Sequence, residues 1–456
     1  MVPDSFKFGG GAADTTMHPV VAGMLLLAIT LLLVLPRKYA VAALLAPVFL
    51  IPLGQVVVVG GVHLTAMRLL LPFAWLRAYQ LHRSEEPFPT VLNSIDKAVI
   101  AWSLFLSAAI VLLYMEQQAL INRIGALYDQ LGSYFLLRNL LRTRADIQRL
   151  IRVFALLVVV FAVLMTYEHF AQQNLFGLLG GVSTAPEMRG DVARAQGPFQ
   201  HSLLAGTFAA TLLPLFVWLW IDGAFPVTAA LGLFGATVMT IASWCSTPVF
   251  AYAAAVCAMA LWWFRRVLSL FRWGLVIALL SLHLVMKAPV WWLIARVSVT
   301  EGSSGYHRAW IVDQFINHFG DWWLIGDRKF DQWGWRTWDL CNDYIPNGVQ
   351  GGLITLSCFI AILVFAFQAV GKARARGAGQ GRGEWLPWLL GCALFAHTIA
   401  FFGISYFDQT RVAWFALLAM ISAVTVRVPV YPRRQTARLP ARPVPVPVAV
   451  VQRRWQ

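Results

Sequence analysis

Charged residues are scarce in this chain. Asp, Glu, Lys and Arg together make up 12% of its 456 residues, whereas apolar residues make up 59%. A water-soluble domain of this length could not bury so much apolar surface, and the composition therefore excludes one. It favours a polytopic helical membrane protein, because apolar stretches near the length that crosses a bilayer as a helix recur along the chain.

Paired cysteines and nucleotide-binding motifs are also missing. The five cysteines include no CxxC pair and lie mostly within apolar stretches, which supports neither a zinc knuckle nor a disulfide framework. Without a Walker or GxGxxG sequence, we expect neither a sugar-nucleotide donor nor a cofactor. The net charge of +15 would suggest nucleic acid in a soluble protein. In a membrane protein, Lys and Arg report topology first, so we expect no nucleic-acid partner.

The apolar stretches predict an all-α fold, a polytopic transmembrane bundle of about 12 to 14 spans. The stretch at 118–137 is the weakest, since Arg123 and Asp129 would also suit an interfacial or pore-side helix. The expected spans are 18–35, 39–59, 63–80, 96–115, 118–137, 150–170, 202–221, 225–243, 246–264, 272–287, 349–370, 386–403 and 412–428.

The basic residues set the expected orientation. When the spans alternate sides, the clusters of Lys and Arg fall on one face, and the positive-inside rule makes that face cytoplasmic. The N-terminus and the loops 171–201, 287–349 and 404–411 fall on the other face, where we expect them to meet. The expected parts are an N-terminal transmembrane bundle (1–170), an arginine-containing loop (171–201), transmembrane helices (202–287), a large loop (288–348), C-terminal transmembrane helices (349–430) and a cytoplasmic Pro/Arg-rich tail (431–456).

One long polar interval, from about Lys287 to Val349, interrupts the apolar sequence. It is rich in tryptophan, arginine and aspartate, and we interpret it as the site. Trp333, Trp335 and Trp338 are interpreted as a wall that faces sugar, because flat apolar rings match the CH-rich faces of pyranoses. The alternative is that these tryptophans mark the membrane interface, where Trp gathers whatever the protein does.

Three arginines are candidates to bind phosphate. Arg189 and Arg194 precede the apolar span that begins near His201, so their guanidinium groups should lie at the membrane surface. Arginine stays charged and offers phosphate a planar fork of donors. The break at 197–199 would add a helix N-terminus, and Arg308 a third cation on the same face. Three arginines would fit a diphosphate without a metal; the alternative is interfacial arginines that reach lipid head groups.

Several residues are candidates for a general base. Asp339, Asp343, His307 and His318 qualify because a carboxylate or an imidazole can accept a hydroxyl proton. His307 is also a candidate for contact with the glycan, and Asn342 would position a hydroxyl group by hydrogen bonding. Each of these residues has a plainer interpretation as a solvated or capping residue.

Two parts of the chain resemble a known superfamily. RAQGPFQHSLLAGTFAATLLPL is similar to the arginine-containing entry to a membrane span in the O-antigen ligase and O-antigen polymerase superfamily. SSGYHRAWIVDQFINHFGDWWLIGD, followed by CNDYIPNGVQGGLITLSCFI, is similar to that superfamily's large periplasmic loop and the Gly-rich start of the next span. The resemblance covers roughly 150–430.

The resemblance implies an integral-membrane glycosyltransferase with a GT-C-like helical fold in the bacterial inner membrane. Such enzymes use glycans linked to a lipid diphosphate at the periplasmic face, without a metal. Arg189 and Arg194 would hold the diphosphate, and Arg308 would complete the grip. The implied partners are an undecaprenyl-diphosphate-linked glycan, a glycan or lipid-core acceptor, membrane lipid and a possible regulator of chain length.

The resemblance departs from the ligase pattern at one position. Ligases carry a His followed by Asn near the end of the large loop, where the His is the proposed base, whereas this chain has Cys341 and Asn342. The departure favours a polymerase or an exopolysaccharide enzyme in which Asp339 or Asp343 is the base. A strict ligase that transfers glycan to lipid A-core stays an alternative. A transporter or flippase of a lipid-linked glycan is another, and a membrane scaffold is a third.

Overall fold

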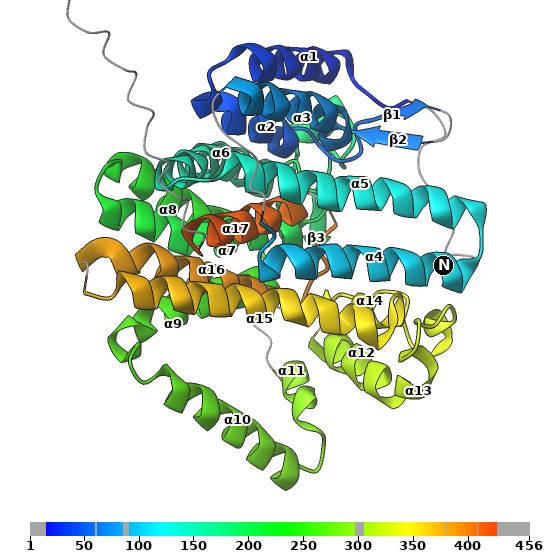
Figure 1. Ribbon diagram of the computed structural model, residues 1–456. Helices are drawn as coiled ribbons and strands as arrows, with labels where there is room; N and C mark the ends of the chain where they lie inside the picture. The colour runs from blue at the N-terminus through cyan, green and yellow to red at the C-terminus, as the bar shows by residue number, and fades with distance from the viewer. Residues whose placement is uncertain are drawn as a thin grey trace, which may run out of the picture. The chain divides into compact units, whose positions relative to one another are not determined.

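A computed structural model describes residues 15–59, 62–84, 91–296, 305–379, 381–407 and 409–425. Figure 1 shows these residues as a bundle of helices with two short hairpins. The tail expected at 431–456 lies outside the described residues.

A helix lies at each stretch expected to span a membrane. Six are long and apolar enough to cross a bilayer, so the described chain is that of a multi-pass membrane protein. The six are α4 (Ser94–Tyr114), α6 (Arg144–Ala171), α7 (Ser202–Asp222), α9 (Ser246–Ala260) with the turn that follows it, α10 (Leu268–Val285) and α15 (Gly352–Gly377). The others at expected spans are α1 (Pro19–Val34), α2 (Arg37–Leu50), α3 (Ala66–Ser84), α5 (Gln117–Leu140), α8 (Pro226–Ala242), α16 (Trp385–Ala400) and α17 (Gln409–Thr425).

The span expected at 39–59 is shorter than predicted. Helix α2 ends at Leu50, and the chain continues into strand β1 (Val56–Val59), which pairs antiparallel with β2 (Val62–Thr65). Four consecutive valines favour a strand because their branched side chains fit a pleated surface, and Pro52 breaks the helix before them. The fold is therefore helical with short hairpins rather than wholly α-helical.

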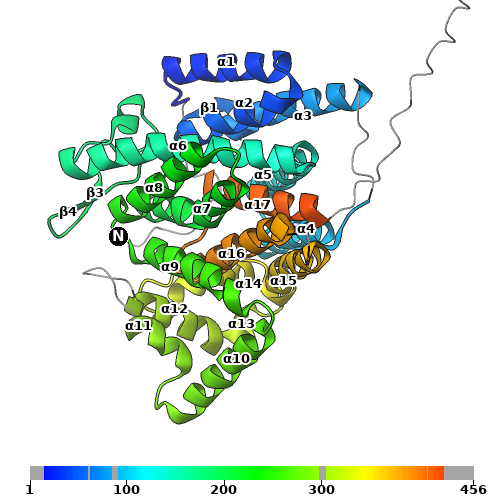
Figure 2. The ribbon, with the colours of Figure 1, turned by 90° about the vertical axis from the view of Figure 1, so that its left-hand side faces the viewer.

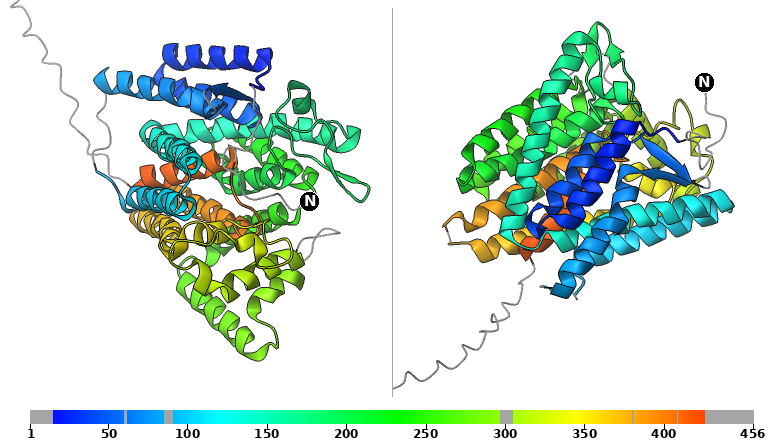
Figure 3. Two further views of the ribbon diagram at one scale, coloured as in Figure 1. Left: turned by 90° about the vertical axis from the view of Figure 1, so that its right-hand side faces the viewer. Right: turned by 90° about the horizontal axis from the view of Figure 1, so that it is seen from above.

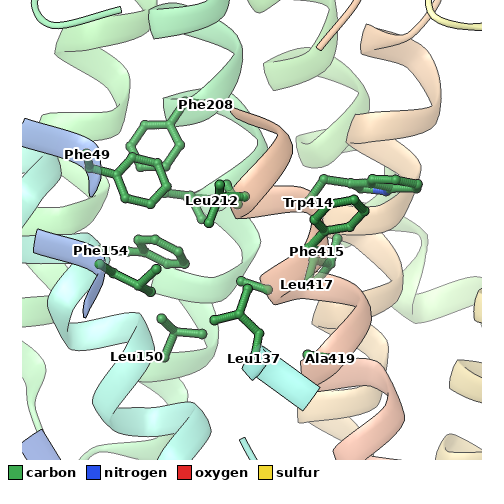
Figure 4. Packing of buried hydrophobic residues seen from close by; sticks show 14 of the residues in the cluster. Phe49, Leu137, Leu150, Phe154, Phe208, Leu212, Trp414, Phe415, Leu417 and Ala419 are labelled. Carbon is green, nitrogen blue, oxygen red and sulfur yellow. The ribbon is translucent and has the colours of Figure 1, made fainter. Parts of the chain in front are cut away.

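Helix α7 lies at the centre of the bundle, where it packs against α6, α8, α9 and α16. Small residues allow these helices to approach closely: a Cβ at Gly206 would lie 2.4 Å from the Ser243 hydroxyl oxygen. Aromatic rings fill the neighbouring space. Phe208 stacks on Phe49, with ring centroids 4.9 Å apart, and meets the edge of Phe154 (Figure 4).

Arginines from several helices gather at one end of the bundle, here called the basic end. There Arg144 donates to Asp222 at 2.6 Å, Arg265 approaches Glu384 at 3.5 Å, and Arg374 and Arg382 donate to the backbone carbonyls of Arg265 and Asp222. The opposite end, here called the site end, carries the connection from α6 to α7 and the segment 305–349. The shorter helices and turns are η1 (Leu175–Leu179), η2 (Leu261–Phe264), η3 (Val290–Trp292), α11 (Leu293–Arg296), α12 (Gly305–Asn317), α13 (Phe319–Trp322), η4 (Phe330–Gln332), α14 (Tyr344–Val349) and η5 (Gly381–Glu384).

Helix α10 stands apart from the other long helices (Figures 2 and 3), and none of its residues is buried. A helix satisfies its own backbone hydrogen bonds, so it can cross a bilayer without protein neighbours. The chain after α10 returns to the site end, where the indole N–H groups of Trp291 and Trp292 both donate to Asp313 Oδ1, at 2.9 and 3.2 Å. This contact ties η3 to α12.

Candidate functional site

A buried carboxylate fixes the loop that enters α7. Glu168 lies at the end of α6, is 1% exposed, and accepts the backbone N–H groups of Gln196 and Gly197 at 3.1 and 2.8 Å. Asn174 donates to the Gly197 carbonyl at 2.8 Å. Gly197 has a φ of +58°, a conformation that glycine adopts without strain. The loop is therefore held at a sharp bend directly before α7.

A short hairpin carries the first two candidate arginines. Strand β3 (Glu187–Arg189) pairs antiparallel with β4 (Val192–Arg194), which places Glu187 opposite Arg194. Arg194 is 2% exposed, donates to Glu187 Oε1 at 2.5 Å, and also donates to the Cys245 sulfur. Its Nε is buried and has no partner among the described residues. A buried guanidinium with a spare donor is suited to an anion.

Helix α12 supplies the third arginine. The Nε of Arg308 is buried, and no described residue accepts a hydrogen bond from it. Burial lowers the pKa of Arg308, and the neighbouring guanidinium groups of Arg189 and Arg194 lower that pKa as well. Arginine nonetheless stays protonated at neutral pH. Three like charges held near one another raise the free energy of the empty site, and a bound anion would relieve that cost.

The segment before Asp339 passes close to α12. Gly334 has a φ of +155°, and a Cβ there would lie 2.9 Å from the ring of Trp310, so a larger residue would push the loop away from the helix. Trp335 follows, 55% exposed, and its ring meets the edge of His307 with centroids 5.4 Å apart. The loop therefore places an exposed indole beside the first turn of α12.

These segments line a partly open polar cavity of about 420 Å³ at the site end. Four arginines and two carboxylates line it, so its formal charge is two units positive with the histidines neutral. It brings together residues from four parts of the chain. Its lining is Glu187, Arg189, Arg194, His201, Leu203, Cys245, Ser246, Tyr306, His307, Arg308, Trp335, Arg336, Asp339 and Cys341.

Asp339 is held on both sides in this cavity. The thiol of Cys341 donates to Asp339 Oδ1 at 2.9 Å, and His307 Nε2 donates to the Asp339 backbone carbonyl at 3.0 Å. Burial raises the pKa of the Cys341 thiol to about 12, and the Asp339 carboxylate contributes to that rise. The thiol therefore stays protonated and remains a hydrogen-bond donor. The other carboxylate oxygen, Oδ2, lies 3.9 Å from His307 Nε2 and 4.0 Å from the Arg336 guanidinium, beyond hydrogen-bond distance of both.

The same residues form a possible group of metal ligands. Ligand atoms of His307, Asp339 and Cys341 lie within 4.8 Å of one another. Nitrogen, oxygen and sulfur ligands in such a set suit zinc. The four guanidinium groups of the cavity oppose a divalent cation, and the thiol would have to lose its proton despite its raised pKa. The arrangement therefore favours an anion, and the expectation that no metal is used stays a prediction.

Asn342 and Asp343 lie outside the described cavity lining. Asn342 Oδ1 accepts the backbone N–H groups of Tyr344 and Ile345, at 2.7 and 3.2 Å, and so caps the first turn of α14. Asp343 is 3% exposed and accepts a hydrogen bond from Arg411 at 3.2 Å. Burial raises the pKa of Asp343, and Arg411 opposes that rise. Both side chains brace α14 against its surroundings.

The three tryptophans predicted to form one wall have different surroundings in the structure. Trp333 packs away from the cavity lining: it stacks on His318, with centroids 4.7 Å apart, and donates to Asp327 at 2.9 Å. Trp338 is 42% exposed, and the Arg336 guanidinium lies 5.7 Å from its ring centroid. Of the three predicted tryptophans, only Trp335 lines the cavity among the described residues.

A second cavity, of about 600 Å³, lies between the β1–β2 hairpin, α3, α5 and the start of α17. Its wall is mainly apolar, and its main charges are matched, since Arg68 donates to both oxygens of Asp129 at 2.6 to 3.0 Å. Gln200 lines this cavity, and the next residue, His201, lines the polar one. The two cavities therefore share a wall.

Sequence reasoning did not single out Glu187, His201, Cys245 or Arg336. His201 Nδ1 accepts the Leu203 N–H at 3.1 Å and so caps α7, and its Nε2 lies 3.4 Å from Glu187. Burial lowers the pKa of His201, and Glu187 opposes that change. Sequence signals existed for Glu187, which shares the short polar stretch 187–194 with the two arginines, and for Arg336, which lies in the polar interval interpreted as the site.

Comparison of the chain with models of protein families gives no match, and comparison with curated proteins gives none either. Function is therefore inferred from the geometry of the site.

Proposed function

We propose that this protein is a membrane glycosyltransferase that uses a glycan linked to a polyprenyl diphosphate. The observation that carries the proposal is the convergence of Arg189, Arg194 and Arg308 in one cavity with Asp339 and the exposed ring of Trp335. The two groups of arginines come from segments more than a hundred residues apart. Interfacial arginines that only reach lipid head groups would have no reason to line one cavity together.

The charge of the cavity supports a diphosphate. A lipid diphosphate esterified to a sugar carries two negative charges, and the lining is formally two units positive. As the sugar leaves, negative charge grows on the diphosphate, where prearranged guanidinium groups stabilise it. Arg194 and Arg308 each have a buried donor without a partner among the described residues, so they can bind phosphate oxygen without giving up another contact.

Asp339 is the residue to which we assign the role of general base. It lines the cavity, and its carboxylate is positioned by the Cys341 thiol. An acceptor hydroxyl attacks the anomeric carbon from the face opposite the diphosphate and transfers its proton to Asp339. The acceptor oxygen bonds to the anomeric carbon as the bond between that carbon and the phosphate oxygen breaks. The electron pair of the broken bond leaves with the diphosphate. Configuration at the anomeric carbon is inverted, and no metal is needed.

The proposed location follows from the two ends of the bundle. The basic end faces the cytoplasm by the positive-inside rule, so the site end faces the periplasm of a bacterial inner membrane. Nucleotide sugars are not available there, which favours a lipid-linked donor. Together with the resemblance noted above, this favours an enzyme that polymerises exopolysaccharide or O-antigen. The expected partners are the undecaprenyl-diphosphate-linked glycan, a glycan or lipid-core acceptor, membrane lipid and a chain-length regulator.

A transporter of lipid-linked glycan is the second candidate, and the second cavity favours it. A large apolar cavity beside a polar one would suit an amphiphile that crosses the membrane. Both arginines that line the second cavity are paired, however, Arg68 with Asp129 and Arg411 with Asp343, so neither is spare for a diphosphate. A transporter also returns its substrate unchanged, so product analysis separates the two candidates.

The test is glycan transfer by the full chain in lipid nanodiscs, supplied with a polyprenyl-diphosphate-linked oligosaccharide and read by product size. A ladder of products indicates a polymerase, and a single transfer to lipid core indicates a ligase. We expect Arg308→Ala and Arg194→Lys to reduce transfer about a hundredfold. Arg328→Ala is the matched control, because Arg328 pairs with Glu116 at 3.0 Å outside the cavity. Unchanged transfer rates in both cavity variants, with the proteins folded, would contradict the proposal that Arg194 and Arg308 bind the diphosphate.

A further inference from the structure

Arg336 has an unusual backbone conformation. Its φ is +53°, in the left-handed region that a side-chain-bearing residue seldom adopts. The turn is closed by a hydrogen bond from the Asp339 N–H to the Arg336 carbonyl at 3.1 Å. A strained residue persists when its surroundings hold it there, and such residues concentrate at binding sites. The backbone conformation of Arg336 therefore favours a binding role for its side chain.

The Arg336 guanidinium lies between two exposed indoles. Its Cζ is 5.7 Å from the ring centroid of Trp335 and 5.7 Å from that of Trp338. Trp335 is 55% exposed and Trp338 42% exposed, and large aromatic rings open to solvent are typical of surfaces that bind sugar. The guanidinium itself is 51% exposed. A cation is thus presented together with two flat rings at one place.

In the charge count of the cavity, Arg336 is offset by Asp339, but the two side chains are only loosely paired. Arg189, Arg194 and Arg308, less the Glu187 carboxylate, already balance the two charges of a sugar diphosphate. Within the part of the chain that the structure describes, Arg336 approaches an anion only at Asp339, and that distance is 4.0 Å. The Asp339 carboxylate is already bound by the Cys341 thiol. Arg336 therefore has donors to offer to a further negative group on the substrate.

We propose that Arg336, with Trp335 and Trp338, binds the carboxylate of an acidic sugar in the glycan, so that the substrate is an acidic polysaccharide unit. The proposal rests on the glycosyltransferase function proposed above. Arginine matches a carboxylate with two parallel N–H donors, while the indoles cover the faces of the pyranose ring. The sugar on the diphosphate lies near Asp339, and the acidic sugar is the next one outward.

The test compares two polyprenyl-diphosphate disaccharides that differ only in the outer sugar, glucose in one and glucuronate in the other. Wild-type protein in nanodiscs of phosphatidylcholine is expected to use the glucuronate donor with a kcat/KM about tenfold higher, a modest ratio because the guanidinium is half exposed. Arg336→Gln is expected to remove this preference, because it should lower kcat/KM about tenfold more for the glucuronate donor than for the glucose donor. Arg328→Gln, at a similarly exposed arginine, is expected to keep it.

A second arm does not depend on turnover. Binding of the free glucuronate-containing disaccharide, followed by tryptophan fluorescence, is expected to weaken in Arg336→Gln and in Trp338→Ala but not in Arg328→Gln. If neither donor is turned over while this binding pattern holds, the glycosyltransferase function fails and the acidic-sugar site stands.

Three results would overturn the acidic-sugar site. The first is equal use of both donors by the wild-type protein, and the second is an equal loss with both donors in Arg336→Gln. The third is a discrimination that appears only when phosphatidylglycerol is added to the nanodiscs, which would assign Arg336 to a lipid head group.

Discussion

The two cavities at the site end differ in how their charged side chains are paired. In the second cavity, Arg68 donates to Asp129 at 2.6 to 3.0 Å and Arg411 donates to Asp343 at 3.2 Å, so each arginine of the lining is paired within the protein. In the polar cavity four guanidinium groups meet two carboxylates, and the buried Nε atoms of Arg194 and Arg308 have no partner among the described residues. Matched charge holds helices together, whereas excess charge raises the free energy of the empty site and is available to a ligand.

The largest expected effect is a difference in transfer rate between two variants, each of which removes one carboxylate from one of the cavities. Asp339→Asn is expected to reduce glycan transfer about a thousandfold, because an amide cannot take the acceptor's proton. Asp129→Asn is the matched control: it removes an equivalent charge from the second cavity and is expected to leave transfer within about twofold, since Arg68 keeps an oxygen acceptor. Transfer rates in nanodiscs measure both effects. Equal losses in the two variants would remove the functional distinction between the cavities.

The wall between the cavities is expected to depend on Glu168. In Glu168→Gln, one backbone N–H of Gln196 or Gly197 would face an amide donor in place of a carboxylate oxygen. An unsatisfied buried N–H costs about 2 kcal/mol. Thermal unfolding of the full chain in detergent should therefore show a lower Tm. Glu116→Gln, at an exposed ion pair, should not change it. An unchanged Tm in Glu168→Gln would mean that this carboxylate does not hold the loop.

The cysteine beside the proposed base is expected to react slowly. With a pKa of about 12, the Cys341 thiol is almost entirely protonated at pH 8, and the thiolate is the form that reacts with iodoacetamide. Asp339→Asn removes the carboxylate that helps raise this pKa, so alkylation at pH 8 should become about tenfold faster. Mass spectrometry reports each cysteine separately. An unchanged rate at Cys341 would show that the thiol does not interact with Asp339.

The arrangement of the bundle follows largely from the sequence. Apolar runs near twenty residues predict helices, because backbone groups in lipid must bond within their own segment. The valines at 56–59 were an exception, since hydropathy cannot distinguish a short apolar strand from the end of a helix. The alternation of sides also placed 171–201 and 287–349 on one face, and parts of both line the polar cavity.

The separation of Asp339 from Asp343 did not follow from the sequence. The two are four residues apart, and both are acids in one polar segment. Only the folded chain buries Asp343 and brings Arg411, from α17, against it, while Asp339 stays at the cavity with the Cys341 thiol. Arg336 was missed for a similar reason, because its place between two rings depends on a turn with positive φ.

The smallest expected effect tests whether the polar cavity has more positive charge than its own carboxylates neutralise. Glu187 Oε1 accepts from Arg194 at 2.5 Å, and its Oε2 lies 3.4 Å from His201, so this carboxylate occupies donors that a diphosphate would use. Glu187→Gln should therefore bind polyprenyl diphosphate about threefold more tightly, a small gain because Glu187 is 47% exposed.

Glu116→Gln is the control for this change. Glu116 is 46% exposed and pairs with Arg328 outside the cavity, so the two variants remove equally exposed carboxylates. Isothermal titration with polyprenyl diphosphate in nanodiscs should show tighter binding in Glu187→Gln alone. Equal gains in both variants would reflect net charge, since each removes one negative charge. Weaker binding in Glu187→Gln would mean that Glu187 orients Arg194 for the ligand and does not compete with it, and the excess of cation would then be smaller than the lining suggests.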